Sequence, residues 1–211
     1  MKIQIITLFP EMFEGVFNTS MLWKAADKGI AEYSCISLRD FGNGPRKTVD
    51  DTPYGGGDGM VLMIEPLMKA VEHAKSIDPS AKVLIMTPRG NKWVQSKAKK
   101  YADDSRGIII ICGRYEGYDE RIVAACDEQI CVGNYVLTGG EIPAMIVTDS
   151  IVRLLPGVLG GETSAEIESF VADDLSVEFP QYTRPEVFRG VSVPSVLLSG
   201  NHGEIAKWRN Q

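Results

Sequence analysis

The chain has 211 residues, of which 44% are hydrophobic and 24% are charged, and its formal net charge is −6 at pH 7. This composition is typical of an ordinary globular protein with one good-sized domain, or with one domain and a small appendage. It excludes a membrane-spanning chain, because no apolar run approaches the roughly 20 residues that a helix needs to cross a bilayer. The acidic balance argues mildly against a nucleic-acid partner.

The N-terminus and the cysteines both indicate a cytoplasmic protein. The first residues, from Met1 to Thr7, lack the long apolar core and the cleavage site of a signal peptide, and we predict a strand there. The cysteines show no C-x-x-C spacing, and three of them lie in apolar runs; they are Cys35, Cys112, Cys126 and Cys131. We therefore expect reduced thiols in the core.

Alternating strand and helix patterns fill the chain as far as Leu38. The predicted elements are a strand over Ile3–Thr7, a helix from Pro10, a helix over Met21–Asp27 and a strand over Tyr33–Leu38. Residues 39–60 then lose all periodicity and are rich in glycine, aspartate and basic residues. This segment is predicted as a long functional loop, with a disordered surface excursion as the alternative.

The same alternation resumes after residue 60. We predict a helix near Pro66, a buried strand over Val83–Met86 that ends in the breaker loop Thr87–Gly90, a helix over Lys92–Ala102 and a buried strand over Gly107–Cys112. Alternation of buried strands with helices is typical of a parallel α/β sheet.

The most informative stretch runs from Cys112 to Ala144. Two glycine-punctuated loops, Gly113–Gly117 and Gly133–Gly140, each follow a short buried strand, and a buried helix begins near Glu141. Open α/β sheets bind ligands where neighbouring strands end, and glycine lets the backbone approach a ligand closely. The sequence therefore predicts a ligand pocket, but no G-x-G-x-x-G follows either strand, which disfavours a nicotinamide-dependent oxidoreductase.

After the buried helix, the alternation of apolar strands and helices ends. Residues 157–163 are glycine-rich and are predicted as a hinge, and residues 179–185 are irregular. The last predicted helix, Gly203–Arg209, has barely two turns, so the chain is interpreted as stopping in mid-element.

Several motifs, taken in this order, closely resemble the bacterial tRNA (guanine-N1)-methyltransferases of the SPOUT superfamily. They are TVDDTPYGGG, GRYEG, YVLTGGE and YTRPE, and the resemblance extends from TLFPEMF to LLSGNHGEIAKWR. It implies an α/β fold in which a parallel sheet carries a deep C-terminal trefoil knot, a rare exception to the rule against threaded chains. A small, mostly helical C-terminal piece follows, and here it is interpreted as truncated.

The resemblance also implies a function and a domain division. The family transfers a methyl group from S-adenosylmethionine to N1 of the guanosine 3′ of the anticodon, position 37 of tRNA, and works as a homodimer with active sites at the subunit interface. Accordingly we expect a methyltransferase domain over residues 1–160, a linker over 161–170 and a partial tRNA-binding domain over 171–211.

Carried over by motif, the cofactor site would comprise residues of the three strand-end loops. They are Met86, Thr87, Pro88, Gly113, Tyr115, Glu116, Gly117, Val132, Gly133, Asn134, Tyr135, Val136, Leu137, Gly139, Gly140 and Pro143.

The chemistry requires two further groups. Guanine N1 carries a proton that a base must remove, and the negative charge that then spreads onto O6 calls for a fixed cation or donor. By the resemblance, Arg153 would meet O6, and Glu168 stands where the family usually has its aspartate base. Asp173, Asp174 and Glu166 are the nearby carboxylates that could replace Glu168.

The predicted RNA contacts lie in the 39–60 segment: Arg46, Lys47, Asp50 and Gly59. Basic residues suit phosphates. No metal-binding residues are predicted, and whether Mg²⁺ takes part is left open. The glutamate at position 168 and the short tail motivate one alternative, a catalytically weak RNA-binding relative that keeps cofactor binding.

Overall fold

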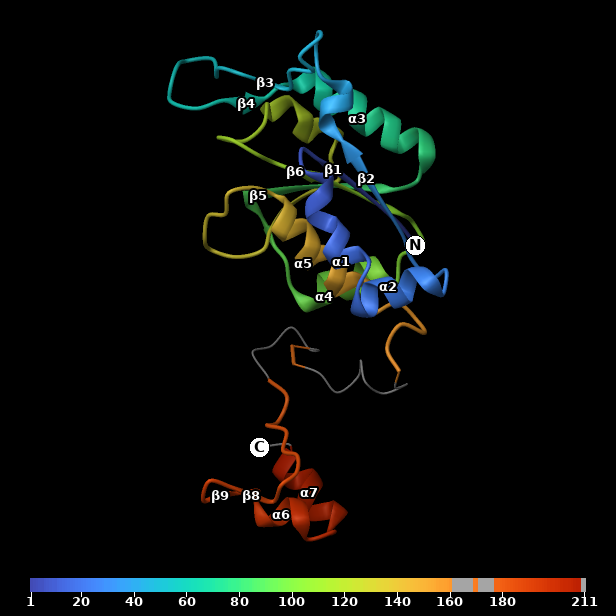
Figure 1. Cartoon of the computed structure of the whole chain (residues 1–211), viewed down its shortest axis with the longest axis vertical. Coiled ribbons are helices and arrows are strands. Elements are labelled where there is room, and N and C mark those ends of the chain that lie inside the picture. The colour runs from blue at the N-terminus through green and yellow to red at the C-terminus, as the bar shows by residue number, and fades with distance from the viewer. Residues whose placement is uncertain (161–168, 171–176, 210–211) are drawn as a thin grey trace. The chain divides into compact units, whose positions relative to one another are not determined.

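The computed structural model describes residues 1–160, 169–170 and 177–209 (Figure 1). The chain divides into two compact units, Met1–Glu162 and Thr163–Gln211, and each is described by itself.

A five-stranded parallel sheet forms the centre of the first unit, in the order β2-β1-β6-β5-β7. Its strands are β1 (Lys2–Thr7), β2 (Glu32–Ser37), β5 (Lys82–Lys92), β6 (Ile108–Cys112) and β7 (Glu128–Cys131). All five residues of β6 are buried, and Ile109 lies opposite Gln4 on one side and Val83 on the other. A central parallel strand is covered on both faces, which explains its continuous apolar run.

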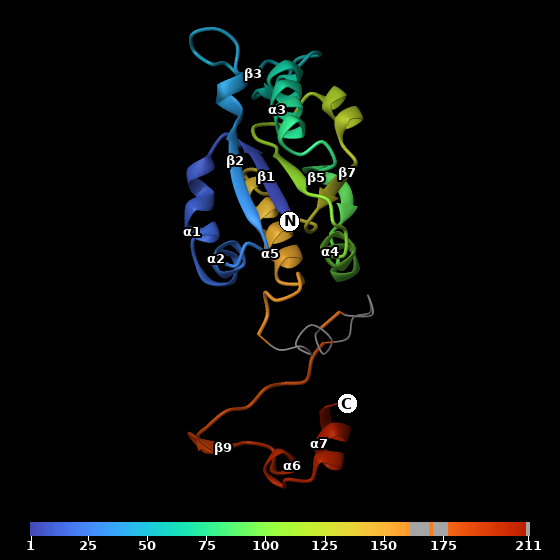
Figure 2. The same cartoon turned by 90° about the vertical axis from the view of Figure 1, so that its right-hand side faces the viewer.

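Helices cover both faces of the sheet (Figures 1 and 2). One face carries α1 (Glu14–Phe17), α2 (Ser20–Asp27), α4 (Gln95–Ala102) and α5 (Glu141–Val152), with the 3-10 helix η1 (Pro10–Phe13). The other face carries α3 (Ile64–Ile77), the 3-10 helices η2 (Leu38–Phe41) and η3 (Glu120–Ala125), and the short strands β3 (Asp50–Asp51) and β4 (Val61–Leu62).

Two hydrophobic clusters result, one on each face. Because successive residues of a strand point to opposite faces, Ile110 packs with Phe13 and Val147 in one cluster, while Ile109 packs with Leu67 in the other. The α/β class with a parallel central sheet is therefore confirmed.

One sequence-based expectation needs correction. β5 does not end at Met86: after a bulge it pairs with β7 again at Asn91 and Lys92, so the breaker loop 87–90 lies inside the strand. Pairing with β7 overrides the proline and glycine content of that segment. Residues 39–60 form a long loop, and the antiparallel pairing of Asp50–Asp51 with Val61–Leu62 excludes the alternative of a disordered excursion.

The second unit is smaller and less buried. Its elements are β8 (Val187–Phe188), β9 (Val191–Ser192), α6 (Ser195–Leu198) and α7 (His202–Arg209). Trp208 lies near Phe179 and Tyr182, with ring centroids 6.3 and 6.2 Å away. No side chain within residues 177–209 is fully buried. The antiparallel β8–β9 pair was not predicted from the sequence.

In the described part of the chain, no helix combines the length and the apolar character needed to cross a bilayer.

Candidate functional site

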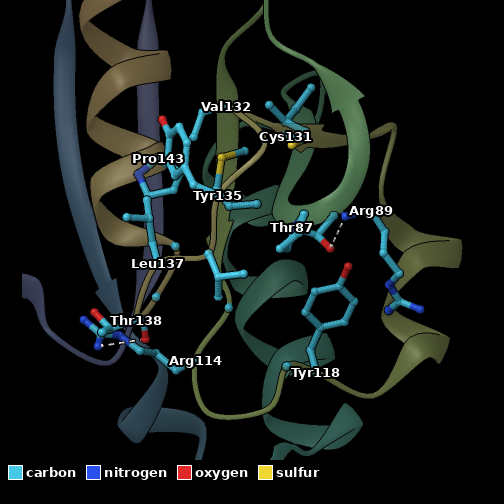
Figure 3. A pocket seen from close by; sticks show the side chains of 18 of the residues that line it. Thr87, Arg89, Arg114, Tyr118, Cys131, Val132, Tyr135, Leu137, Thr138 and Pro143 are labelled. Atoms are coloured by element: carbon cyan, nitrogen blue, oxygen red, sulfur yellow. Dashed lines mark hydrogen bonds between the residues drawn. The ribbon is translucent and has the colours of Figure 1, made fainter.

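A cavity of about 520 Å³ lies where β6 and β7 end, beside the bulge of β5 (Figure 3). Its volume falls within the roughly 300–1,000 Å³ that is usual for small-molecule sites. The side chains of Tyr135, Leu137 and Pro143 lie on one side of it, and those of Thr87 and Tyr118 lie on the other. We call this cavity the glycine-loop pocket, because the loops 113–117 and 133–140 form most of its wall.

The glycine-loop pocket gathers every residue predicted for the cofactor site except Asn134. Six further residues line it that the sequence reasoning missed: Arg89, Arg114, Tyr118, Ile130, Cys131 and Thr138. All six lie in or beside the same strand-end loops. Their position in or beside those loops could have predicted that they lie near the pocket. The sequence does not show which of their side chains face it.

Gly140 holds the two loops together. Its backbone N–H donates to the carbonyl of Gly113 at 2.8 Å, and a Cβ at position 140 would lie 2.7 Å from the Cα of Cys112. The sequence predicts glycine here for a close approach to a ligand, and Gly140 does line the pocket. The structure adds a close approach between two segments of the chain, so a side chain at this position would separate the loop from the end of β6.

A buried carboxylate ties the pocket to the first strand. Glu141, 1% exposed, accepts hydrogen bonds from the Thr7 hydroxyl and from Nε of Arg114, both at 2.8 Å. Arg114 also donates to the Thr138 carbonyl at 3.3 Å, and its guanidinium stands 4.5 Å from the Phe9 ring centroid. This network links β1, the 113–117 loop and the start of α5, so it fixes the loops that surround the pocket.

The 39–60 segment ends against the 113–117 loop. The N–H of Glu116 donates to the Met60 carbonyl, and the N–H of Leu62 donates to the Gly117 carbonyl, both at 3.0 Å. Gly59 has a φ of +85°, in the left-handed region that favours glycine, and a Cβ there would lie 2.6 Å from Cγ of Glu116. One wall of the pocket is thus continuous with the predicted RNA-binding loop.

Tyr115 stands at this junction in a left-handed backbone conformation with a positive φ. Such a conformation is uncommon for a residue other than glycine. Burial raises the pKa of the Tyr115 hydroxyl, and the nearby Asp50 carboxylate raises it further. Two predicted RNA contacts, Asp50 and Gly59, therefore lie beside the pocket loop. The other two, Arg46 and Lys47, are exposed, and Lys47 pairs with Asp40 at 2.8 Å.

The structure describes one of the two predicted catalytic residues, Arg153, and this residue lies outside the pocket. Arg153 directly follows α5 and is half-buried, and it is absent from the pocket lining. With a rise of about 1.5 Å per residue, the ten residues from Pro143 put Arg153 about 15 Å away along the helix. Glu168 lies outside the described residues, as do Glu166, Asp173 and Asp174.

Among the described residues, no group of three or more His, Cys, Asp or Glu side chains is arranged to hold a metal ion. The four cysteines are unbridged, and burial raises the pKa of the Cys35 thiol to about 11 and that of Cys126 to about 12.

Comparisons with known proteins agree on one family. The family model described as tRNA (Guanine-1)-methyltransferase TrmD matches residues 1–211. A tRNA (guanine-N(1)-)-methyltransferase of Geobacillus kaustophilus is 51% identical over 213 residues, which cover 100% of this chain and 86% of the relative. One of Geobacter sp. strain M21 is 50% identical over 212 residues, covering 100% of this chain and 84% of the relative.

A solved structure is also similar over nearly the whole chain. It is the tRNA (m1G37) methyltransferase from Aquifex aeolicus, with a TM-score of 0.82 and 38% identity. The match covers 99% of this chain and 87% of the Aquifex chain.

Proposed function

Because the chain belongs to the tRNA (guanine-1)-methyltransferase family and methylates N1 of guanosine 37 in tRNA, we propose that it binds S-adenosylmethionine in the glycine-loop pocket, at an active site shared by two copies of the chain. The alternative of a catalytically weak RNA-binding protein finds no support in these relatives, which carry the name of the enzyme.

The glycine-loop pocket suits this cofactor in size and chemistry. An adenine ring needs an apolar slot with backbone hydrogen-bonding groups nearby. The pocket combines apolar walls with loop backbone that carries no side chain at Gly113, Gly117, Gly139 and Gly140. When bound, the cofactor supplies an electrophilic methyl group on a sulfonium centre. The loops of this chain would hold and orient it, while the Arg114–Glu141 ion pair keeps the loops in place.

Two side chains would act on the guanine. We propose that the Glu168 carboxylate removes the N1 proton, which makes N1 nucleophilic. The Arg153 guanidinium would meet the charge that develops on O6, where a fixed donor stabilises the transition state more than the ground state.

The position of Arg153 supports a shared site. It lies about 15 Å from Pro143 along the same helix, so it is far from the pocket of its own chain. On α5 the residues Ile142, Ile146 and Asp149 are exposed and are spaced to share one face with Arg153. Ile142 and Ile146 are 47% and 41% exposed, a large value for isoleucines on an otherwise buried helix.

A two-fold axis running across this face would cover the isoleucines in an isologous interface. It would also place the partner copy's α5 in the reverse direction, and so carry the end of that helix toward the pocket mouth. We therefore propose a homodimer in which each pocket receives its arginine from the other copy.

We propose the remaining assignments from the same resemblance. The loops 113–117 and 133–140 would form the trefoil knot, and the hydrogen bond from Gly140 to Gly113 supports their tight association. Arg46, Lys47, Asp50 and Gly59 would contact tRNA, and residues 171–211, joined by the linker 161–170, would add to its binding. The cytoplasm, where tRNA is found, is the proposed location.

The separation of Arg153 from the glycine-loop pocket is the observation that supports a shared site most directly, and mixing of two inactive variants tests it. Arg153→Ala removes the guanidinium, and Val132→Phe places a larger side chain in the pocket so that the cofactor cannot bind. Each variant alone should be inactive. When the two are mixed after dissociation, a shared site predicts recovery of about one quarter of the wild-type rate, because half of the dimers have one intact site.

A site within one chain predicts no recovery. Sedimentation and thermal unfolding of each variant provide the controls for assembly and folding. Titration calorimetry with S-adenosylhomocysteine, and with NAD for comparison, tests the cofactor assignment separately. Only S-adenosylhomocysteine should bind.

A further inference from the structure

The hydroxyl of Tyr118 is a buried polar group for which the described residues offer no hydrogen-bond partner of good geometry. Tyr118 is 8% exposed and lines the glycine-loop pocket. Two other buried side-chain atoms in the described part of the chain share this condition, on Gln4 and Thr148, and neither residue lines the pocket. Tyr118 alone among these three could therefore be paired by a ligand.

The Tyr118 ring cannot easily turn away. The backbone on both sides of it is tied to β4, because the N–H of Leu62 donates to the Gly117 carbonyl at 3.0 Å and the N–H of Asp119 donates to the Leu62 carbonyl at 2.9 Å. A Cβ at Gly113 would stand only 3.4 Å from Cδ1 of the ring. The ring also belongs to the hydrophobic cluster under α3. The hydroxyl is therefore held at the pocket wall.

The polar neighbours of the hydroxyl already have partners. Figure 3 shows the hydroxyl directed toward the end of the pocket where Thr87 and Arg89 lie. The Thr87 hydroxyl accepts from the N–H of Arg89 at 3.3 Å, and the Arg89 guanidinium donates to Glu120 at 2.6 Å. The hydrogen bond and charge of Glu120 account first for the raised pKa of Arg89, and the charge and hydrogen bond of Tyr118 contribute least. A contact from the guanidinium uses only a lone pair of the Tyr118 oxygen, so the hydroxyl proton stays available to an acceptor on a ligand.

An unpaired buried hydroxyl is costly, whereas the same hydroxyl contributes binding energy when a ligand pairs with it. We propose that the Tyr118 hydroxyl forms a hydrogen bond with the bound S-adenosyl cofactor, so that Tyr118 is a ligand-binding residue beyond the loop motifs of the family. This inference rests on the proposed cofactor site. It makes an unusual prediction: the hydroxyl should matter to the liganded protein and not to the free one.

Tyr118→Phe tests the inference, because it removes the hydroxyl and keeps the ring. Calorimetry with S-adenosylhomocysteine should give a dissociation constant raised about threefold to tenfold, the value of one net hydrogen bond. The melting temperature of the free protein should be unchanged or higher. In turnover assays the KM for S-adenosylmethionine should rise while kcat stays near that of the parent.

Tyr101→Phe is the matched control. The Tyr101 hydroxyl, on α4 and outside the pocket lining, donates to the Glu128 carboxylate at 2.9 Å. This variant should lower the melting temperature and leave the dissociation constant unchanged. Loss of the Tyr118 hydroxyl would then change the dissociation constant without lowering the melting temperature, and loss of the Tyr101 hydroxyl would do the reverse.

Three outcomes would overturn the inference. An unchanged dissociation constant for Tyr118→Phe means that the hydroxyl does not contact the ligand, while the cofactor site stands if the parent protein binds. A lower melting temperature with an unchanged constant means that the hydroxyl is paired within the protein. If the parent protein itself fails to bind S-adenosylhomocysteine, both the proposed cofactor site and the proposed role of Tyr118 are wrong.

Discussion

The glycine-loop pocket and the C-terminal unit differ in what holds them in place. The pocket loops follow β6, in which every residue is buried, and β7, in which the last two residues are buried, and they are joined by Gly140–Gly113 and Glu141–Arg114 contacts. Residues 177–209 contain no fully buried side chain, and their strands are two residues long. Helices and strands this short are only marginally stable by themselves.

This difference suggests that the two regions bind different partners, the pocket the cofactor and the C-terminal unit the tRNA. A small cofactor is best bound by a site that exists before it arrives, because ordering loops on binding lowers affinity. A large polyanion such as tRNA can order a weakly packed surface as it binds. The proposed catalytic residues, Arg153 and Glu168, follow the pocket in the sequence and precede the C-terminal unit's described elements. Substitutions in the two regions should therefore affect different steps, cofactor binding in one and tRNA binding in the other.

Glu168→Gln should give the largest effect. The amide keeps the size of the side chain but cannot accept the N1 proton, and loss of a general base typically costs about 10²–10⁴-fold in rate. Single-turnover assays at saturating tRNA and cofactor measure it, and the rate should rise with pH because the substrate must lose a proton. S-adenosylhomocysteine affinity should be unchanged.

Glu168→Asp is the control for this prediction, since it restores the residue usual in the resembling family, and it should be at least as active as the parent. A Glu168→Gln variant within threefold of the parent would exclude Glu168 as the base. Asp173 would then be the next residue to test.

Glu141→Gln should damage the pocket through stability. It leaves the largely buried Arg114 guanidinium without its carboxylate. Removing one partner of a buried pair costs on the order of 3 kcal/mol. Urea unfolding measures the loss, and S-adenosylhomocysteine affinity should fall with it.

Glu65→Gln, which breaks the exposed pair with Lys69 on α3, is the matched control for Glu141→Gln. Exposed pairs contribute little, so this variant should change neither stability nor affinity. If the two variants had the same stability and the same S-adenosylhomocysteine affinity, the buried network around Glu141 would not hold the loops.

Trp208→Ala should act on the C-terminal unit alone. It removes the ring that lies near both Phe179 and Tyr182. Each aromatic pair contributes roughly 1 kcal/mol. Limited proteolysis should cut faster within residues 177–209, and tRNA affinity should weaken severalfold. Trp208→Phe should recover much of the loss. If Trp208→Ala lowered S-adenosylhomocysteine affinity as well, the two regions would not be independent.

Arg46→Ala and Lys47→Ala should have the smallest effects. If each side chain contacts one phosphate, each variant should weaken tRNA binding modestly and reduce the slope of log affinity against log salt by about one. Filter binding over a range of salt concentrations measures both. Lys69→Ala, an exposed lysine on α3, is the control for net charge. An unchanged slope would remove the 39–60 loop from the RNA surface.

Much of the pocket could be predicted because its signal is local. Buried strands read as apolar runs, glycines mark the loops that follow them, and parallel strands end at the same edge of the sheet. That reasoning located the pocket wall, with only Asn134 outside it, although the role of these residues in cofactor binding stays a prediction. Arg114 and Tyr118 were missed because the direction of a side chain depends on what packs around it.

The sequence by itself determined the class of the fold, the order of its strands and helices, the edge of the sheet at which a ligand would bind and, by resemblance, the family. These follow from periodicity, glycine placement and distinctive motifs, all of which are local properties. The tertiary structure decided that β5 resumes after its bulge, that Gly140 packs on Cys112, and that Arg114 and Tyr118 line the pocket. Each of these depends on contacts between residues distant in the chain, and no local pattern encodes such distances.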